Sequence, residues 1–313
     1  MTTLKTDLAH LPARARRDLA QAVDILREEF ARRTARSNAP HIRGGRILKI
    51  ILFGSYARGR QVVDPVGRYF SDYDILVIVD HDELTDAAEY WTQAEDRMVE
   101  MLTRRFWPQP LNLIIHSLHD INHQLERGRY FFIDIVKEGI ALFEEPGPML
   151  ADPVPLSPDE ARKEAQFYFD EDFPGVQRAL VTASFQHEQA KAATTAKEML
   201  KWRNEAAFNL HQAAERAYYC ILLVLKLYRP KSHNLNFLSQ RCEQLDPRLI
   251  GLWQRETKQG KRCYELLRAA YIKARYSDFY KITDDELDWL TARIRELQAL
   301  TETICTERLA VPD

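Results

Sequence analysis

Two stretches decide the fold of the first half of the chain: ILKIILFGSYARG, residues 47–59, and SDYDILVIV, residues 71–79. Each carries a short run rich in β-branched apolar residues, which predicts a buried strand, and LNLIIHS at 111–117 predicts a third. Apolar residues at helical spacing predict helices at residues 12–34, 84–105, 118–127 and 130–143. The first half is therefore expected to be a mixed α/β domain with a small mixed sheet.

The residues around these strands have the chemistry of a phosphate and metal site. Gly54 lacks a Cβ, so the backbone can approach a phosphate closely, and Ser55 adds a hydroxyl. Asp72 and Asp74 are two residues apart on an extended segment, so their carboxylates share one face, with Cα atoms about 6.6 Å apart. Such a pair beside a phosphate-binding turn supplies the oxygen ligands that Mg²⁺ prefers. We expect in-line phosphoryl-group displacement there.

The order of these motifs resembles the minimal nucleotidyltransferases of the DNA polymerase β-like superfamily, whose pattern is G-S-x-A-x-G followed by D-x-D. The matching residues are Gly54, Ser55, Ala57, Gly59, Asp72 and Asp74. The resemblance implies transfer of a nucleoside monophosphate from an NTP, with ATP the expected one, to a hydroxyl acceptor. It also implies that Gly54 and Ser55 hold the triphosphate and that Asp72 and Asp74 hold Mg²⁺ in a two-metal site.

One residue within this pattern and the loop after it need separate interpretation. Arg58 either contacts the phosphates or is a solvated residue of the turn. The loop 60–70 is longer than in the most compact members of the superfamily, and we expect a small hairpin built around residues 64–67.

The resemblance also draws attention to a third metal position. The family often places a third carboxylate on a later strand, and here that position is Asn112, an uncharged and poorer ligand. Either two aspartates suffice, or Asp134 or Glu138 substitutes, or activity is reduced. His116 and His119 follow the same strand, and we expect them to be structural rather than catalytic bases.

A proline-rich segment separates the two halves of the chain. Five prolines fall between residues 146 and 158, which predicts an extended linker. At its end Ser157 is a candidate N-cap, Pro158 suits the first helical position, and Glu160 completes a capping box. We therefore expect a domain at 1–145, a linker at 146–158 and a second domain at 159–313.

The second half has helical periodicity almost throughout. We expect an all-α bundle of about four or five helices, at residues 160–170, 176–200, 247–274 and 284–308 and along an alanine-rich apolar stripe at 206–225. Residues 203–216, 230–235 and 270–276, in this order behind a nucleotidyltransferase-like half, resemble HEPN domains. The resemblance implies a helical bundle that often forms dimers, and so a homodimer through this half.

Many HEPN domains are metal-independent ribonucleases that use an arginine and, four to six residues later, a histidine. This pattern is not met here: Arg229 and His233 are too close in sequence, and no histidine follows Arg275 within reach. A ribonuclease is thus a minor alternative. Another is a toxin–antitoxin type protein, in which the first half modifies or silences the second by adding AMP to a tyrosine, with Tyr276 and Tyr280 as candidates.

Composition limits the remaining classes. The formal charge is −2, from 44 basic and 46 acidic residues, so RNA is not indicated as a partner. There is no apolar stretch of the length of a membrane span, and the start lacks the apolar core of a secretory signal. The four separated cysteines suggest reduced thiols and a cytoplasmic protein. The acceptor is open: an aminoglycoside, a nucleic-acid end and a protein tyrosine all present a hydroxyl.

Overall fold

A mixed four-stranded sheet forms the centre of the N-terminal half. In the computed structural model, which describes residues 3–61, 63–64, 69–104, 106–107, 109–230, 232–277 and 279–310, the strand order is β5-β4-β1-β6. Strands β1 (Ile47–Phe53), β4 (Tyr73–Val79) and β5 (Leu111–Ser117) have the predicted bounds. Strand β1 is antiparallel to β4 and β6, and β4 is parallel to β5, which confirms the predicted mixed sheet.

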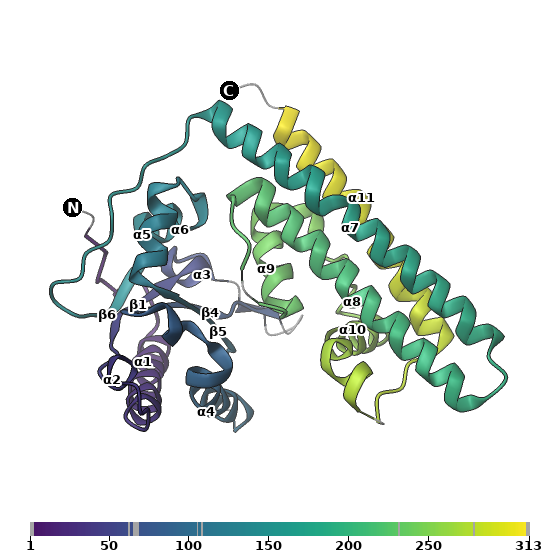
Figure 1. Cartoon of the computed structure of the whole chain (residues 1–313), viewed down its shortest axis with the longest axis horizontal. Coiled ribbons are helices and arrows are strands. Elements are labelled where there is room, and N and C mark those ends of the chain that lie inside the picture. Colours follow the sequence, from purple (N-terminus) through teal and green to yellow (C-terminus); the bar gives the residue numbers. More distant parts are fainter. Residues whose placement is uncertain are drawn as a thin grey trace. The chain divides into compact units, whose positions relative to one another are not determined.

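Helices cover both faces of this sheet (Figure 1). Helices α1 (Ala13–Thr34) and α4 (Thr92–Thr103) lie on one face, where alternate strand residues such as Ile75 and Val77 join their apolar core. Helices α5 (Leu118–Glu126) and α6 (Tyr130–Glu138) lie on the other face. Because side chains alternate along a strand, the even-numbered residues of β4 and β5, Asp74 and Asn112 among them, face away from the α1 core.

The structure corrects two of the predicted helices. The helix expected at 130–143 ends at Glu138, and residues Ile140–Glu144 form β6, an edge strand on β1. Gly139 is extended there and turns the chain into the strand. The helix expected at 84–105 is divided into a 3₁₀ turn, Asp82–Thr85, a π-helical turn, Ala87–Trp91, and α4. Asp86 accounts for the division, because its side chain caps the amide of Glu89.

Short elements connect the strands. Helix α2 (Pro40–Arg43) precedes β1, and α3 (Gly54–Ala57) follows it directly. Strands β2 (Val63–Asp64) and β3 (Tyr69–Phe70) are antiparallel, as expected for a hairpin in this loop. Residues 65–67 of its predicted turn, and residue 68 after it, lie outside the described residues.

The chain divides into two compact units, residues 1–156 and 157–313. Residues 145–157, which include four of the five prolines, form no helix or strand, and the fifth, Pro158, is the first residue of the next helix. The predicted capping box is present at the next helix: the Ser157 hydroxyl accepts from the Glu160 amide, and the Glu160 carboxylate accepts from the Ser157 amide at 3.0 Å. This cap begins helix α7.

The second unit is helical in its described residues. Its helices are α7 (Pro158–Ala192), α8 (Ala196–Lys226), α9 (Leu235–Leu245), a 3₁₀ turn (Pro247–Leu249), α10 (Lys258–Tyr276) and α11 (Asp284–Ala310). Helices α7, α8 and α11 run side by side (Figure 1). The alanine-rich stripe of α8 is buried, so its small side chains serve close helix packing.

Helix boundaries in this unit differ from those predicted. One helix, α7, spans Pro174, where the sequence predicted a break, and the chain breaks instead at 193–195, where Thr195 caps α8. An internal proline costs about 3 kcal/mol or more in an isolated helix, and packing along α8 offsets that cost here. The helix expected at 247–274 begins only at Lys258, and α9 was not predicted.

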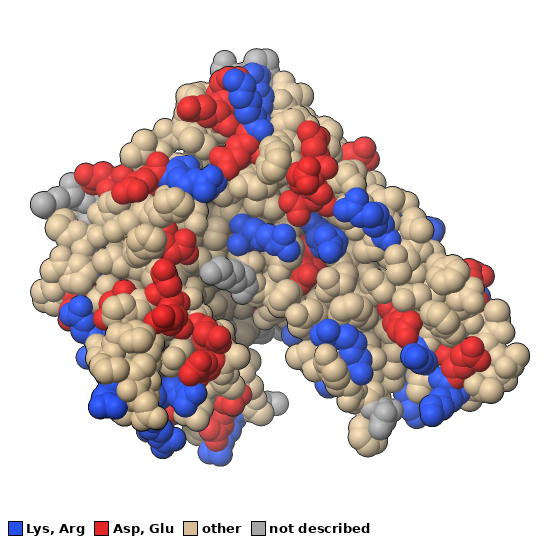
Figure 2. Space-filling view, in the orientation of Figure 1, with Lys and Arg blue, Asp and Glu red and all other residues tan. Residues whose placement is uncertain are grey.

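The surface charge and the apolarity of the helices agree with what the composition predicted. Basic and acidic side chains are interspersed on the face shown in Figure 2, in line with the formal charge of −2. Among the described residues, we find no helix with the length and apolarity needed to span a membrane.

Candidate functional site

The two predicted metal ligands meet at one point. Asp72 directly precedes β4 and Asp74 is its second residue, and both side chains are buried. The Nδ2 atom of Asn112 donates to Asp72 Oδ2 at 3.1 Å and to Asp74 Oδ1 at 3.2 Å. A single nitrogen can reach both carboxylates only if they project from the same face, as the two-residue spacing predicted.

Strand register explains why Asn112 reaches both aspartates. Asp74 lies opposite Asn112 on β5 and opposite Phe53 on β1. Neighbouring residues in a sheet lie within about 5 Å of each other, so the side chain of Asn112 lies directly beside Asp74. Asn112, at the position where the resemblance expects a third carboxylate, is thus next to the aspartates. It donates hydrogen bonds to them, which a carboxylate would not do.

The glycine–serine turn lies at the same end of the sheet. Since Phe53 pairs with Asp74 in an antiparallel register, Gly54 and Ser55 follow this pair at the end of the sheet where Asp72 lies, and α3 contacts β4. Gly54 has a φ of 77°, a conformation that L side chains rarely adopt, so glycine is needed where β1 turns into α3. The Ser55 hydroxyl is buried and has no hydrogen-bond partner among the described residues.

A buried polar network supports this turn and strand. The rings of Tyr56, on α3, and Tyr73, between the two aspartates, are 4.5 Å apart. The Tyr73 hydroxyl donates to Asp18 Oδ2 on α1 at 3.3 Å. Burial raises the pKa of Tyr56 to about 12 and raises the pKa of Asp18 above its ordinary value. The ring contact and the hydrogen bond therefore hold the turn and the strand against α1.

The alternative third carboxylates do not complete a metal cluster. Glu138 Oε2 accepts from the Arg58 guanidinium at 3.1 Å, so this predicted phosphate contact is occupied by an ion pair. Within the described part of the chain, no group of three or more His, Cys, Asp and Glu side chains is arranged to hold a metal ion. Neither Asp134 nor Glu138 therefore forms such a group with Asp72 and Asp74, and Asn112 is the third polar residue of the site.

Comparisons with known proteins agree with this geometry. A nucleotidyltransferase domain model matches residues 39–114, which include the turn, both aspartates and Asn112. A HEPN domain model matches residues 180–304. The chain is a nucleotidyltransferase domain followed by a HEPN domain. No curated protein sequence matches it.

The histidines of the nucleotidyltransferase domain have structural partners. His116 is buried, its Nδ1 lies 2.5 Å from Asp120 Oδ2, and its ring meets Phe132 edge to face. It is four residues beyond Asn112 on β5, about 13 Å along the strand. His119 is exposed and lies near Asp82. This placement agrees with the structural roles expected for both.

The HEPN domain contains a polar cluster that sequence reasoning missed. Glu215, on α8, is buried, and its Oε1 lies 2.7 Å from His233 Nδ1 and 4.0 Å from His211 Nε2. His211, on the same helix, is also buried, and burial lowers its pKa. Tyr271 stacks on the His233 ring at 4.5 Å. In the sequence, the only hint of this cluster was Glu215 itself, a charged residue within the alanine-rich apolar stripe of α8.

The arginine and tyrosines singled out in the HEPN domain lie close to this cluster. The Arg275 guanidinium lies 4.6–5.0 Å from the ring centres of Phe208, Tyr271 and Tyr276. Tyr271 thus lies between Arg275 and His233, two residues that the sequence keeps far apart. Of the two candidate acceptor tyrosines, Tyr276 is 76% exposed, whereas Tyr280 is 4% exposed and donates its hydroxyl to Leu266 O.

Proposed function

We propose that the N-terminal unit is a Mg²⁺-dependent nucleotidyltransferase that transfers a nucleoside monophosphate from an NTP to a hydroxyl acceptor. The acceptor oxygen bonds to the α-phosphorus, the bond from that phosphorus to the bridging oxygen of the β-phosphate breaks, and pyrophosphate leaves. The observation that carries the proposal is the convergence of the Asp72 and Asp74 carboxylates on one nitrogen of Asn112. The match to a nucleotidyltransferase domain over these residues supports it.

The donor set suits a hard divalent cation. Asp72 and Asp74 offer carboxylate oxygens, the ligand type that Mg²⁺ prefers. Both carboxylates are buried, where two negative charges side by side are costly unless a cation or donor compensates them. The unpartnered Ser55 hydroxyl, at the same end of the sheet, is suited to a phosphate oxygen. These residues therefore fit a metal-bound triphosphate.

Each residue has a distinct role in this proposal. Asp72 and Asp74 hold the metal, Gly54 and Ser55 hold the triphosphate, and Asn112 orients the two carboxylates. Bound Mg²⁺ neutralises charge on the phosphates and polarises the phosphorus centre that is attacked. Asn112 is a poor general base, so the acceptor hydroxyl is expected to lose its proton without help from that position.

The direct test is transfer of label from α-³²P-labelled NTPs in Mg²⁺ to small-molecule, nucleic-acid and protein acceptors. We expect the double variant Asp72→Asn plus Asp74→Asn to lose transfer by about a hundredfold or more. The matched control is Asp24→Asn plus Asp96→Asn, which makes the same charge change at exposed positions of the same unit. Equal transfer by wild type and the double variant would contradict the proposal.

A second candidate acceptor is a tyrosine of the HEPN domain itself, which would make the chain a self-modifying protein of toxin–antitoxin type. Its support is the contrast between the exposed Tyr276 and the buried Tyr280. Exposure is required because the attacking hydroxyl must reach the nucleotide. Tyr280, by contrast, already uses its hydroxyl in a hydrogen bond inside the domain.

Intact-mass measurement after incubation with ATP and Mg²⁺ tests this candidate. We expect the mass of at least one AMP to be added to wild type and to Tyr280→Phe, and no addition to Tyr276→Phe. An unchanged mass of the wild-type chain would rule out self-modification, and the transfer assay would then be pursued with separate acceptors alone.

A further inference from the structure

The C-terminal end of α10 and the segment after it expose apolar side chains. Ile272 is 62% exposed and Phe279 is 92% exposed, and Tyr276 lies between them in sequence. Lys273 follows Ile272, and Lys281 lies two residues after Phe279. We call these five residues the α10 surface. Exposed aromatic residues grouped in this way are typical of binding surfaces.

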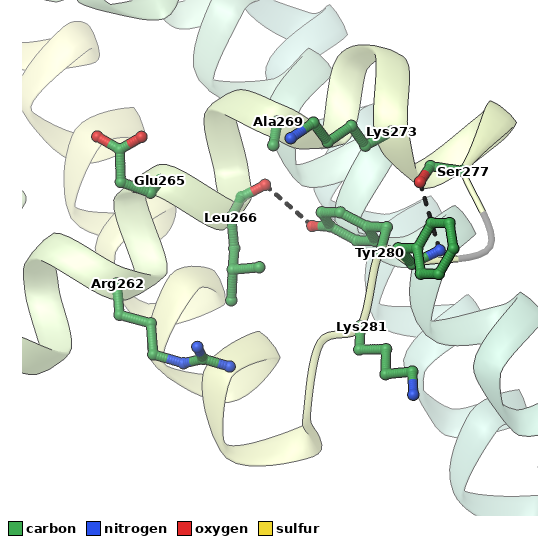
Figure 3. A pocket seen from close by; sticks show the side chains of 9 residues that line it. Arg262, Glu265, Leu266, Ala269, Lys273, Ser277, Tyr280 and Lys281 are labelled. Carbon is green, nitrogen blue, oxygen red and sulfur yellow. Dashed lines mark hydrogen bonds between the residues drawn. The ribbon is translucent and has the colours of Figure 1, made fainter.

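A cavity opens beside this surface (Figure 3). It has a volume of about 650 Å³, and Leu266, Ala269, Phe279 and Tyr280 provide apolar walls. The hydrogen bond from the Tyr280 hydroxyl to Leu266 O, at 3.0 Å, fixes one wall. Lys273 and Lys281 lie on either side of Tyr280 (Figure 3). The cavity is therefore apolar inside and carries positive charge at its edge.

The positive charge at the edge has no acidic partner among the residues that the structure describes. Of the other charged residues lining the cavity, Arg262 pairs with Glu286, and Glu265 pairs with Arg268 at 2.8 Å. No acidic side chain in the described part of the chain pairs with Lys273 or Lys281. The carboxylates near the cavity are thus already used, and two ammonium groups remain.

A second cavity continues the α10 surface around the helix. It has a volume of about 470 Å³, shares Glu265, Ala269 and Lys273 with the first cavity, and adds Ile272, Tyr271 and His233 to its walls. An extended ligand could therefore contact both cavities across Lys273.

We propose that the α10 surface binds an acidic peptide segment that carries an apolar anchor residue. The carboxylates of the segment pair with Lys273 and Lys281, and the anchor fills the cavity lined by Leu266, Ala269 and Phe279. Such a match of sign between two surfaces favours specific association. Single-stranded RNA satisfies the lysines and the aromatic ring but has no aliphatic side chain for the cavity, so a peptide fits both features.

The test starts from selection with a displayed random peptide library on the full-length chain. We expect enrichment of peptides that combine Asp or Glu with Phe, Leu or Ile. A fluorescein-labelled peptide of the enriched sequence is then titrated with wild type and variants. Phe279→Ser, and separately Lys273→Glu plus Lys281→Glu, should each weaken binding by about tenfold or more. The lysine effect should fall as salt is raised.

Matched controls distinguish binding at the α10 surface from nonspecific hydrophobic or electrostatic binding. Phe167→Ser removes an exposed phenylalanine from α7, and Lys258→Glu plus Lys261→Glu makes the same charge change at the start of α10. Both controls should bind like wild type. The altered positions are exposed, so thermal unfolding should stay unchanged.

Three outcomes would overturn the proposal. The first is no acidic–apolar enrichment, or binding that the α10 variants retain. The second is tighter binding of a labelled oligouridylate that the same variants abolish, which would assign the surface to RNA. The third is self-association of wild type in sedimentation velocity that Phe279→Ser abolishes, which would assign the surface to a second copy of this chain.

Discussion

At the scale of single residues, the candidate site depends on Asn112. Its amide donates to both aspartates, so it compensates part of their charge inside a buried site. A carboxylate at this position would instead add a third negative charge and a third oxygen ligand for a cation. The residue therefore sets a balance between the stability of the domain without metal and the strength with which metal is held.

Asn112→Asp tests this balance. Without Mg²⁺ we expect the free energy of unfolding to fall by about 1–3 kcal/mol, because a hydrogen bond is replaced by repulsion between buried carboxylates. Mg²⁺ should restore the stability, because an ion that binds only the folded state stabilises it. Thermal unfolding of wild type and variant in EDTA and in Mg²⁺ measures both effects. Equal destabilisation under both conditions would show that no ion is held there.

At the scale of elements, the structure shows which helices and strands can be predicted from the sequence. Strands β1, β4 and β5 were predicted because each contains a short run of β-branched and other apolar residues. Strand β6 was missed because Ile140–Glu144 continues the apolar pattern of α6, and Gly139 alone marks the change. The shared face of Asp72 and Asp74 follows from local periodicity, whereas the meeting of Glu215 with His233 depends on how a loop packs on α8.

The contact between α1 and β4 gives a prediction about pH. Burial raises the pKa of Asp18, so above its ordinary value of 3.8 the unfolded chain releases this proton more readily than the folded one. Asp18 therefore costs stability as pH rises through that window. Asp18→Asn keeps an acceptor for the Tyr73 hydroxyl and removes this cost.

We expect Asp18→Asn to raise the unfolding temperature at pH 7 and to approach wild type as pH falls toward 3. Melting curves across this pH range, with the exposed Asp24→Asn on the same helix as control, measure the difference. A lower unfolding temperature for Asp18→Asn at pH 7 would show that the charged form of Asp18 is needed.

At the scale of the whole molecule, each compact unit has the parts of an independent domain. The sheet of residues 1–156 has an apolar core under α1 and α4, and the edge strand β6 is paired with β1. Helix α8 of residues 157–313 is buried along most of its length by its neighbours in the same unit. Units of about 150 residues with their own core are of the usual size for autonomous folding.

The two fragments 1–156 and 157–313, expressed separately, should therefore each unfold cooperatively. A shorter fragment, 1–139, is the control, because it lacks β6 and so exposes the edge of β1 and loses the hydrogen bond from the Ala141 amide to Lys5 O. It should show no cooperative transition, because β1 then has an unpaired edge and the apolar core is open on that side. Circular dichroism melts measure all three. Cooperative unfolding of 1–139, or none in 1–156, would show that the sheet does not define the folding unit.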